Sequence, residues 1–176
     1  MSKNNLADFI ENFRKKYGDK TESVEIFEKT RASIIVKPDY LIILAEVLRD
    51  DYGFIIPIGA GAIDYPEESR MQMIYYLNSP ESDFIVVYRI NIDRDAVVLP
   101  SMTQVWEAMS FHERETHEMF GIGFKGHPDL RPLLLPDELV GKFPMRKSFV
   151  TDRSREDETG LATPKPRPNP AGGDSS

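Results

Sequence analysis

Cysteine is absent from this chain of 176 residues. Without thiols the chain forms no disulfide bond, and it lacks the thiolate ligands that usually hold iron–sulfur clusters and structural zinc ions. We therefore expect the chain itself to carry no cofactor. Any redox centre that it works with would have to belong to a partner.

Basic residues are also few, because 22 Lys and Arg stand against 29 Asp and Glu, and the formal net charge is −7. Nucleic acids and anionic membranes require a basic patch, so neither is expected as a partner. No apolar run approaches the roughly 18 residues that span a bilayer, and the first residues lack the apolar core of a secretory signal. We expect a soluble, intracellular chain with one domain and a tail.

The first part of the chain shows the periodicities of an α+β protein. Residues 5–17 and 39–48 have the apolar spacing of helices. Strands are predicted for the apolar runs 24–27, 32–36, 54–63, 71–77 and 84–92, with the first two as a hairpin. The last run alternates from Val86 onward, which is typical of a half-buried antiparallel strand. We predict a mainly antiparallel sheet, ordered as a meander with helices against one face, and GAGAID (59–64) as a strand edge or a bulge.

A capping-box pattern, Ser101 followed by Gln104, predicts a helix that runs to Phe120, where Gly121 offers a left-handed cap. Prolines at 128, 132, 136 and 144 then exclude regular structure. We divide the chain into an α+β domain (1–121), an extended segment (122–150) and a proline-rich tail (151–176). The tail has too little apolar surface to fold alone, so it is expected to be partner-bound or disordered.

The three histidines lie close together in FHERETHEMFGIGFKGHPDL (111–130) and invite comparison with the zinc-protease pattern HExxH. Here His112 and His117 are five residues apart, which places them roughly 140° apart around a helix, too far to share one ion. A site made of Glu113, His117 and His127 is not required by the spacing. The chain also has no nucleophile elbow, P-loop or dinucleotide fingerprint.

One carboxylate in this stretch occupies an unusual position. Trp106, Met109, Thr116 and Phe120 form an apolar stripe at helical spacing, and Glu113 falls within it. A carboxylate buried without a partner is very costly, so Glu113 is predicted to pair with Arg131 or Arg146. Arg114 and Glu118, four residues apart, would either pair on the helix surface or belong to a solvated helix face.

The same stretch closely resembles the signature of the 30-kDa-type hydrophilic subunit of respiratory complex I, also called the C subunit of NADH-quinone oxidoreductase. The resemblance extends back through IDYPEESRMQMIYYLNS and PSMTQVWEA and forward through GKFPMRKSF, so that it covers roughly residues 25 to 150. The matching signature residues are Glu113, Arg114, Glu115, Glu118, Met119, Phe120, Gly121, Ile122, Phe124, Gly126, His127, Pro128, Asp129, Leu130 and Arg131.

The sequence departs from the family pattern at several positions. Many relatives have arginine at the position of Pro132, tryptophan at Phe111 and aspartate at Ser148, and an aromatic–aspartate pair where this chain has His117 and Glu118. With the short length, these differences favour the branch found in membrane-bound, energy-converting [NiFe] hydrogenases, whose complexes share this subunit with complex I.

The resemblance implies an α+β subunit without redox centres, at the cytoplasmic side of a membrane complex. It would clasp the subunit related to the hydrogenase large subunit (49-kDa type), touch the small iron–sulfur subunit, and reach the membrane subunits only indirectly. A NiFe centre or iron–sulfur clusters would belong to those partners. The residues expected at the partner interface are Glu113, Arg114, Glu115, Glu118, Gly121, Gly126, His127, Pro128, Asp129, Arg131, Arg146 and Lys147.

Two other classes of function remain open from the residues. One is a small metal-dependent hydrolase that uses His112, Glu113, His117 and His127, and it predicts bound metal and turnover by the isolated chain. The other is a free-standing binding module whose tail attracts a proline-recognising domain. That module would be a monomer that needs no fixed partner.

Overall fold

The structure, a computed structural model, describes residues 5–95 and 97–150, and the expected proline-rich tail lies outside these described residues. Helix α1 (Leu6–Tyr17) begins after Asn5, whose side chain accepts a hydrogen bond from the backbone of Ala7 and so caps the helix. Helix α2 (Leu41–Asp50) follows a short 3₁₀ turn at Pro38–Tyr40 and starts slightly later than predicted. Neither helix, nor any other among the described residues, is long and apolar enough to cross a bilayer.

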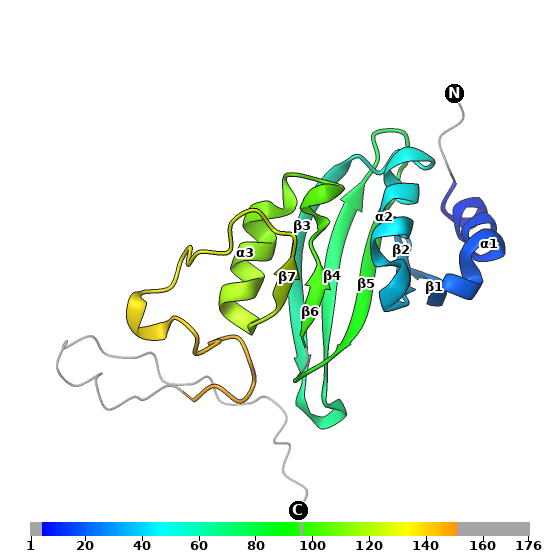
Figure 1. The fold of residues 1–176 in the computed structure, drawn as a ribbon. Coiled ribbons are helices and arrows are strands. Elements are labelled where there is room, and N and C mark those ends of the chain that lie inside the picture. Colours follow the sequence, from blue (N-terminus) through cyan, green and yellow to red (C-terminus); the bar gives the residue numbers. More distant parts are fainter. Residues whose placement is uncertain (1–4, 96, 151–176) are drawn as a thin grey trace, which may run out of the picture.

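The main sheet has five strands: β1 (Thr21–Glu28), β2 (Arg31–Val36), β3 (Ile56–Tyr65), β4 (Arg70–Asn78) and β5 (Ile85–Asp93). Their spatial order is β1-β2-β5-β4-β3, and only the β2–β5 pair is parallel. The predicted hairpin is confirmed, but the single meander is wrong. After β2 the chain crosses the sheet through α2 and re-enters at the far edge, so that the β3-β4-β5 meander returns beside β2 (Figure 1). GAGAID lies in β3, an edge strand as predicted.

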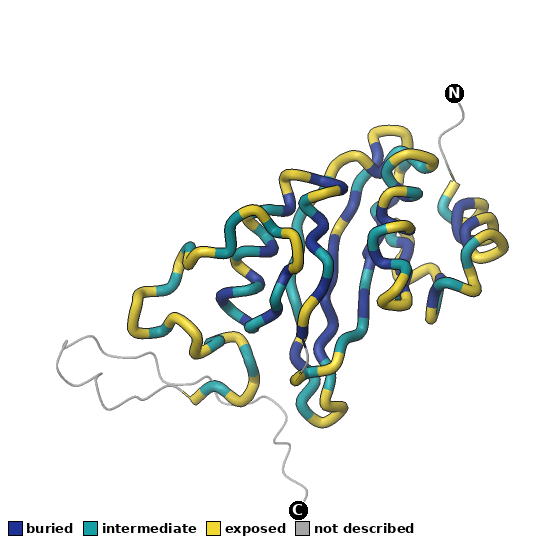
Figure 2. The backbone as a smooth tube through the Cα atoms, viewed as in Figure 1, coloured by how far each residue is buried: buried dark blue, intermediate teal, exposed yellow. Residues whose placement is uncertain are grey.

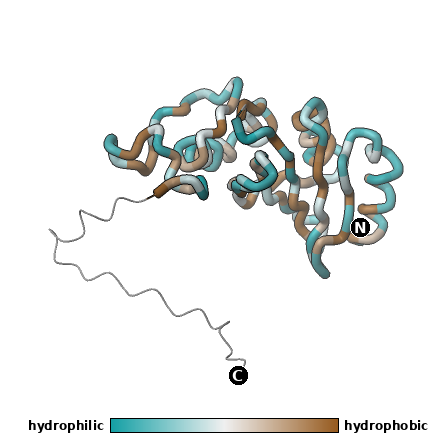
Figure 3. Tube along the Cα trace, turned by 90° about the horizontal axis from the view of Figure 1, so that it is seen from below, coloured by the Kyte–Doolittle hydropathy of each residue, from teal (hydrophilic) through white to brown (hydrophobic). Residues whose placement is uncertain are grey.

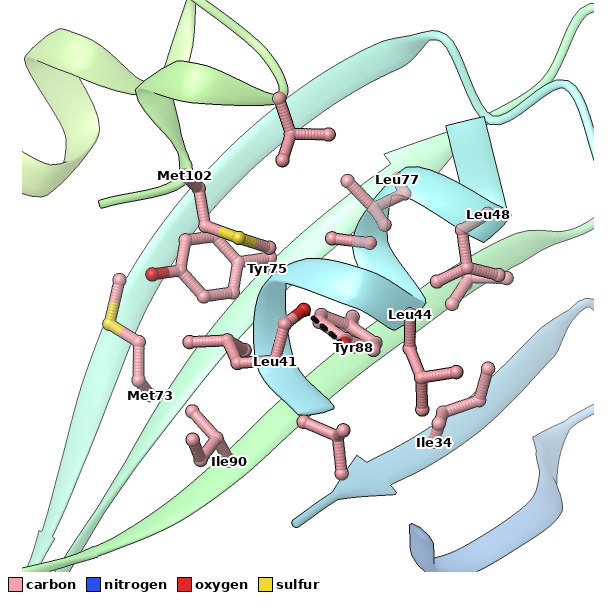
Figure 4. Close-up of a cluster of buried hydrophobic side chains, with 14 of the residues drawn as sticks. Ile34, Leu41, Leu44, Leu48, Met73, Tyr75, Leu77, Tyr88, Ile90 and Met102 are labelled. Carbon is pink, nitrogen blue, oxygen red and sulfur yellow. Dashed lines mark hydrogen bonds between the residues drawn. The ribbon is translucent and has the colours of Figure 1, made fainter. Parts of the chain in front are cut away.

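One face of the sheet forms the core together with α2. The alternation predicted for β5 is confirmed, because Val86, Tyr88 and Ile90 are fully buried and belong to this core. Figure 4 shows Tyr88 and Ile90 in the same cluster as Met73 and Leu77 of β4. The Tyr88 hydroxyl donates a 2.7 Å hydrogen bond to the backbone oxygen of Leu41, which satisfies it at the start of α2. Burial is concentrated in the sheet and the elements packed on it (Figure 2).

A second unit closes the core beside β3. It consists of β6 (Val98–Pro100), a 3₁₀ turn (Met102–Gln104), α3 (Met109–Phe120) and β7 (Gly123–Lys125), and β6 and β7 pair in parallel. Figure 1 shows α3 beside β3, at the opposite end of the sheet from α1.

The helix predicted from Ser101 therefore starts only at Met109. Ser101 caps the 3₁₀ turn instead, accepting from the backbone of Thr103, and the Gln104 amide donates to the Ser101 carbonyl oxygen rather than accepting from its N–H. The chain then turns so that the buried Trp106 indole donates to the Phe54 backbone oxygen over 3.1 Å. Gly121 ends α3 with a φ of 75°, the left-handed cap that was predicted.

Candidate partner interface

Glu113 is fully buried on the face of α3 that carries Met109, Thr116 and Phe120, as the stripe predicted. Its carboxylate accepts hydrogen bonds from the Ser101 hydroxyl (2.6 Å), the Met102 backbone N–H (2.7 Å) and the Tyr75 hydroxyl (3.2 Å). Burial raises the pKa of Glu113, and the three donors oppose that rise. The carboxylate thus joins α3 to strand β4 and to the turn after β6.

The predicted arginine partner of Glu113 is wrong. Arg131 makes a two-pronged ion pair with Asp129, with nitrogen–oxygen distances of 2.9 and 2.8 Å, and Arg146 donates to the Phe120 backbone oxygen. Neutral hydroxyl and amide donors satisfy Glu113 instead. Sequence spacing could not reveal them because the tyrosine comes from a strand 38 residues earlier.

Two other polar side chains of α3, those of Arg114 and Glu118, hold residues 122–150, the segment after α3 that we call the arm. Arg114 donates to the backbone oxygens of Arg131 and Pro132. Glu118 accepts from three consecutive backbone amides, those of Leu133 (3.2 Å), Leu134 (2.9 Å) and Leu135 (2.8 Å). Both side chains therefore grip the arm rather than forming the predicted ion pair on the helix surface.

The Glu118 site is electrostatically favourable. Burial raises the pKa of this carboxyl group, but the three amide donors and nearby Arg114 outweigh burial, so that the pKa lies below its usual value. A row of amides that converges on one carboxylate is a compact anion-binding arrangement. Here the anion belongs to the protein itself and fixes the arm against α3.

The first turn of the arm is organised around His127. Its Nδ1 accepts from the backbone N–H of Asp129 (3.0 Å), so Nε2 carries the proton that is donated to the Ser110 backbone oxygen (3.0 Å). Gly126 has a φ of 84°, a conformation that favours glycine. The hydrogen bonds from Arg131 hold the pKa of Asp129 well below its usual range. Pro128 is exposed beside them.

The far end of the arm returns to α3 and β3. The backbone N–H of Met145 donates to the Met119 oxygen (3.1 Å), and Arg146 lies over the ring of Phe143 while donating to Phe120. A β-carbon added at Gly121 would come within 2.7 to 2.9 Å of that ring, so glycine is needed for the approach as well as for its φ.

Asp64 is the anchor that sequence reasoning missed. This almost fully buried carboxylate on β3 accepts two hydrogen bonds from Arg94 (2.7 and 3.1 Å) and one from the Lys147 backbone N–H (2.8 Å). The Arg94 hydrogen bonds hold the pKa of Asp64 below its usual value, although burial opposes this. A signal was present, because the alternation of GAGAID places Asp64 on the same face as Ala60 and Ala62.

The histidines occupy separate structural positions. His117 contacts the backbone oxygen of Ile122 through Nδ1 (2.8 Å), His127 bonds Ser110, and His112 lies near Gly59 of β3. Within residues 5–95 and 97–150, no group of three or more His, Cys, Asp or Glu side chains is placed to hold a metal ion. Glu115, also predicted for the interface, is exposed on the outer face of α3, and Lys147 is exposed at the arm's end.

The arm leaves apolar side chains facing solvent. Leu134 is 60% exposed and Met145 is 58% exposed, and Val140 and Val150 are exposed as well. Figure 3 shows hydrophobic stretches along this segment, outside the body of the domain. The residues described therefore form an α+β domain with an arm that is held through its backbone and that turns apolar side chains toward solvent.

Comparison with known proteins gives the family. Residues 34–155 match the family described as "Respiratory-chain NADH dehydrogenase, 30 Kd subunit". A relative in Moorella thermoacetica, the C subunit of an NADH-quinone oxidoreductase, is 35% identical over 145 residues, covering 82% of this chain and 95% of the relative. Another, the C subunit of the F(420)H(2) dehydrogenase of Methanosarcina mazei, is 29% identical over 140 residues, covering 80% of this chain and 89% of the relative.

Two solved structures share the fold. A chain of the membrane-bound sulfane sulfur reductase, an archaeal respiratory membrane complex, superimposes with a TM-score of 0.77 at 19% identity, covering 92% of this chain and 95% of that one. The trypsin-resistant fragment of Nqo5 gives a TM-score of 0.60 at 22% identity, covering 72% of this chain and 100% of the fragment. The chain belongs to the family of 30-kDa subunits of respiratory-chain NADH dehydrogenase and is a subunit of a complex of that type.

Proposed function

We propose that this chain is a structural and assembly subunit, without a redox centre of its own, on the cytoplasmic side of a membrane-bound oxidoreductase that couples electron transfer to ion translocation. In this role its arm clasps the partner related to the hydrogenase large subunit, and the domain touches the small iron–sulfur subunit. Family membership and the absence of cysteine support the proposal.

The observation that carries the proposal is how the arm is held. Side chains of the domain grip the arm through its backbone: Arg114 and Glu118 near its middle, and Asp64 at its end. Ordering a residue costs about 1–2 kcal/mol of backbone entropy. Because these contacts meet part of that cost before a partner arrives, the arm is prepared for binding.

The side chains that the arm presents fit a partner surface that is apolar and mildly acidic. Leu134 and Met145 point outward, and the arm has five basic residues against three acidic ones, whereas the whole chain has a net charge of −7. An apolar contact with complementary charge is the usual composition of a stable protein interface.

The type of complex is a separate question. The relatives named above belong to NADH-quinone and F(420)H(2) dehydrogenases, whereas the departures at Phe111, Pro132 and Ser148 favoured the [NiFe] hydrogenase branch. We propose the hydrogenase branch on those departures, with the quinone branch as the alternative. Nickel in the purified complex would support the first, and NADH-oxidising flavin subunits would support the second.

Purification of the whole complex through this subunit tests the assembly role. Helix α1 lies at the opposite end of the sheet from α3 and the arm (Figure 1), so a tag is added before α1. After gentle membrane solubilisation, the wild-type chain should bring down a large subunit of the hydrogenase type and a small iron–sulfur subunit. Recovery of the chain alone, as a stable monomer, would contradict the role and favour a free-standing module.

Two double variants test whether the contact with the large subunit lies on the arm. Leu134→Ser/Met145→Ser should lower the recovery of the large subunit at least about tenfold, because anchoring side chains dominate interface energies. A matched control, Ile26→Ser/Ile43→Ser, changes two isoleucines that are each 53% exposed and lie on β1 and α2. Equal recovery in both double variants would count against clasping by the arm.

A further inference from the structure

A second exposed apolar surface lies outside the arm. Two isoleucines at the start of β3, the isoleucine just before it and one aromatic on α3 face solvent: Ile55 is 56% exposed, Ile56 43%, Ile58 52% and Phe111 65%. Single exposed apolar side chains are ordinary, but neighbouring ones from two elements mark an interaction site. We call these four residues the β3–α3 patch.

Hydrogen bonds and contacts show that the two segments lie side by side. The Trp106 indole, just before α3, donates to the backbone oxygen of Phe54, just before the patch. Farther along, the His112 ring lies 3.8 Å from the point where a β-carbon of Gly59 would be. The chain from 54 to 59 thus runs along the chain from 106 to 112, as Figure 1 shows for β3 and α3.

The patch has an acidic rim. Glu107 lies in the turn that precedes α3, four residues before Phe111, and Glu115 lies one helical turn after Phe111; both are exposed. On the other side, Ile55 shares a surface hollow of about 430 Å³ with Asp50, Asp51 and Glu81. The one arginine of that hollow, Arg49, is committed to Asp50 and to the backbone oxygen of Val105. An apolar centre with a charged rim is the anatomy of a protein–protein interface.

The structure of β3 disfavours one mode of binding at the start of the strand. An edge strand can receive another strand through its free backbone groups. Here Pro57 has no N–H to offer, and the register of β3 shifts between Pro57 and Gly59. We therefore expect a partner to meet this part of β3 with its side chains.

The charge of the rim decides between the possible occupants. Two copies of this chain would bring the acidic rims together, and an anionic membrane would be repelled by the same carboxylates. We propose that the β3–α3 patch docks a second protein subunit of the complex, through apolar side chains surrounded by lysine and arginine. This inference rests on the proposed assembly role, and it names the surface through which the domain itself, apart from the arm, meets another subunit.

A binding measurement against the rest of the complex tests the patch. The complex lacking this subunit is purified from a deletion strain and immobilised, and the full-length chain is added. Ile58→Ser/Phe111→Ser should raise the Kd at least about tenfold. The matched control Ile26→Ser/Ile43→Ser should stay within about twofold of wild type. All four positions are exposed, so circular dichroism and Tm should be unchanged.

The negative charge of the rim can be tested separately. Glu107→Lys/Glu115→Lys should lower the association rate and weaken its dependence on salt, because a basic rim on the partner attracts the wild-type carboxylates. The control Glu11→Lys/Glu46→Lys makes the same change in net charge on α1 and α2, away from the patch. Equal association rates for the two charge variants would show that the rim does not face a basic surface.

A photo-crosslinking residue at position 111 identifies the occupant. A cross-link to another subunit, at a peptide with apolar residues and Lys or Arg, supports the proposal. Cross-linking to a second copy of this chain, or wild-type affinity for Ile58→Ser/Phe111→Ser, overturns it. If neither the wild-type chain nor any variant bound the remaining complex, the proposed assembly role itself would be wrong.

Discussion

Replacing Glu118 by alanine is the sharpest test of how the arm is held. Glu118 is a buried residue of α3 whose two carboxylate oxygens receive the backbone amides of Leu133, Leu134 and Leu135. The alanine variant removes this acceptor and leaves the amides to water. Alanine has the highest helix propensity, so α3 itself should remain intact.

The magnitude follows from the hydrogen bonds. A bond to a charged group contributes about 1.5–3 kcal/mol when the alternative is an unsatisfied group, but the released amides can be hydrated. We therefore expect a total loss of roughly 2–4 kcal/mol in the free energy that holds this part of the arm, less than the sum of three bonds. That loss corresponds to a roughly 30- to 700-fold larger open population.

Native-state hydrogen exchange measures this population amide by amide. In Glu118→Ala the amides of residues 133–135 should lose protection by that factor, while amides in β4 and β5 keep theirs. Glu115→Ala is the matched control, because it removes the same charge from α3 but Glu115 accepts no hydrogen bond from the described part of the arm. Unchanged protection at residues 133–135 in Glu118→Ala would refute the idea that this carboxylate orders the arm.

The same site predicts a pH dependence. The pKa of Glu118 lies below its usual value of 4.5 when the arm is bound to it. Such a group stabilises the bound arm at pH values above the usual pKa, and the stabilisation is lost as the pH falls through the lowered pKa. Protection factors at residues 133–135 should therefore drop in acid for the wild type and stay flat for Glu118→Ala.

Three further substitutions test the other contacts. Glu113→Ala should lower stability by about 3 kcal/mol in urea unfolding and weaken assembly, because it leaves the Tyr75, Ser101 and Met102 donors buried without an acceptor. Glu113→Gln should cost less and abolish the wild-type loss of stability as the pH rises through the raised pKa of Glu113. Asp64→Asn should lower the free energy of unfolding by about 2–4 kcal/mol and expose the backbone amide of Lys147 to hydrogen exchange. If this amide exchanged equally fast in the variant and the wild type, Asp64 would not anchor the arm. Gly121→Ala should lower Tm more than Gly126→Ala, because both glycines have a positive φ but only a β-carbon at Gly121 would collide with the ring of Phe143. Equal decreases in Tm would show that the collision with Phe143 does not contribute.

The elements of the fold were predictable where one local pattern decided them. The alternation of β5, the hairpin of β1 and β2, and the Gly121 cap all follow from residues close in sequence. The sheet order was not predictable in this way. The parallel β2–β5 pair depends on α2 crossing the sheet, and strand periodicity does not encode that choice.

The contacts of α3 also divide into those that a local pattern predicted and those that depend on distant segments. The apolar stripe correctly placed Glu113 in the core, but its partners were wrong because formal charge suggested arginine where Tyr75, Ser101 and Met102 supply the donors. The spacing of Arg114 and Glu118 suggested a mutual pair for a similar reason. Spacing along a helix identifies neighbours on that helix, but it contains no information about the backbone of a segment that returns to it.

An arm that binds a partner has to be ordered, and its apolar side chains also have to stay exposed. If apolar side chains such as Leu134 and Met145 packed on the domain, they would order the arm but be hidden from a partner. Here the backbone is gripped by Arg114, Glu118 and Asp64, so the side chains stay available. The arm has a net positive charge and favours an acidic partner surface, whereas the acidic rim of the β3–α3 patch favours a basic one. Two contacts of opposite charge would fix the orientation of this subunit, which a single contact would leave free.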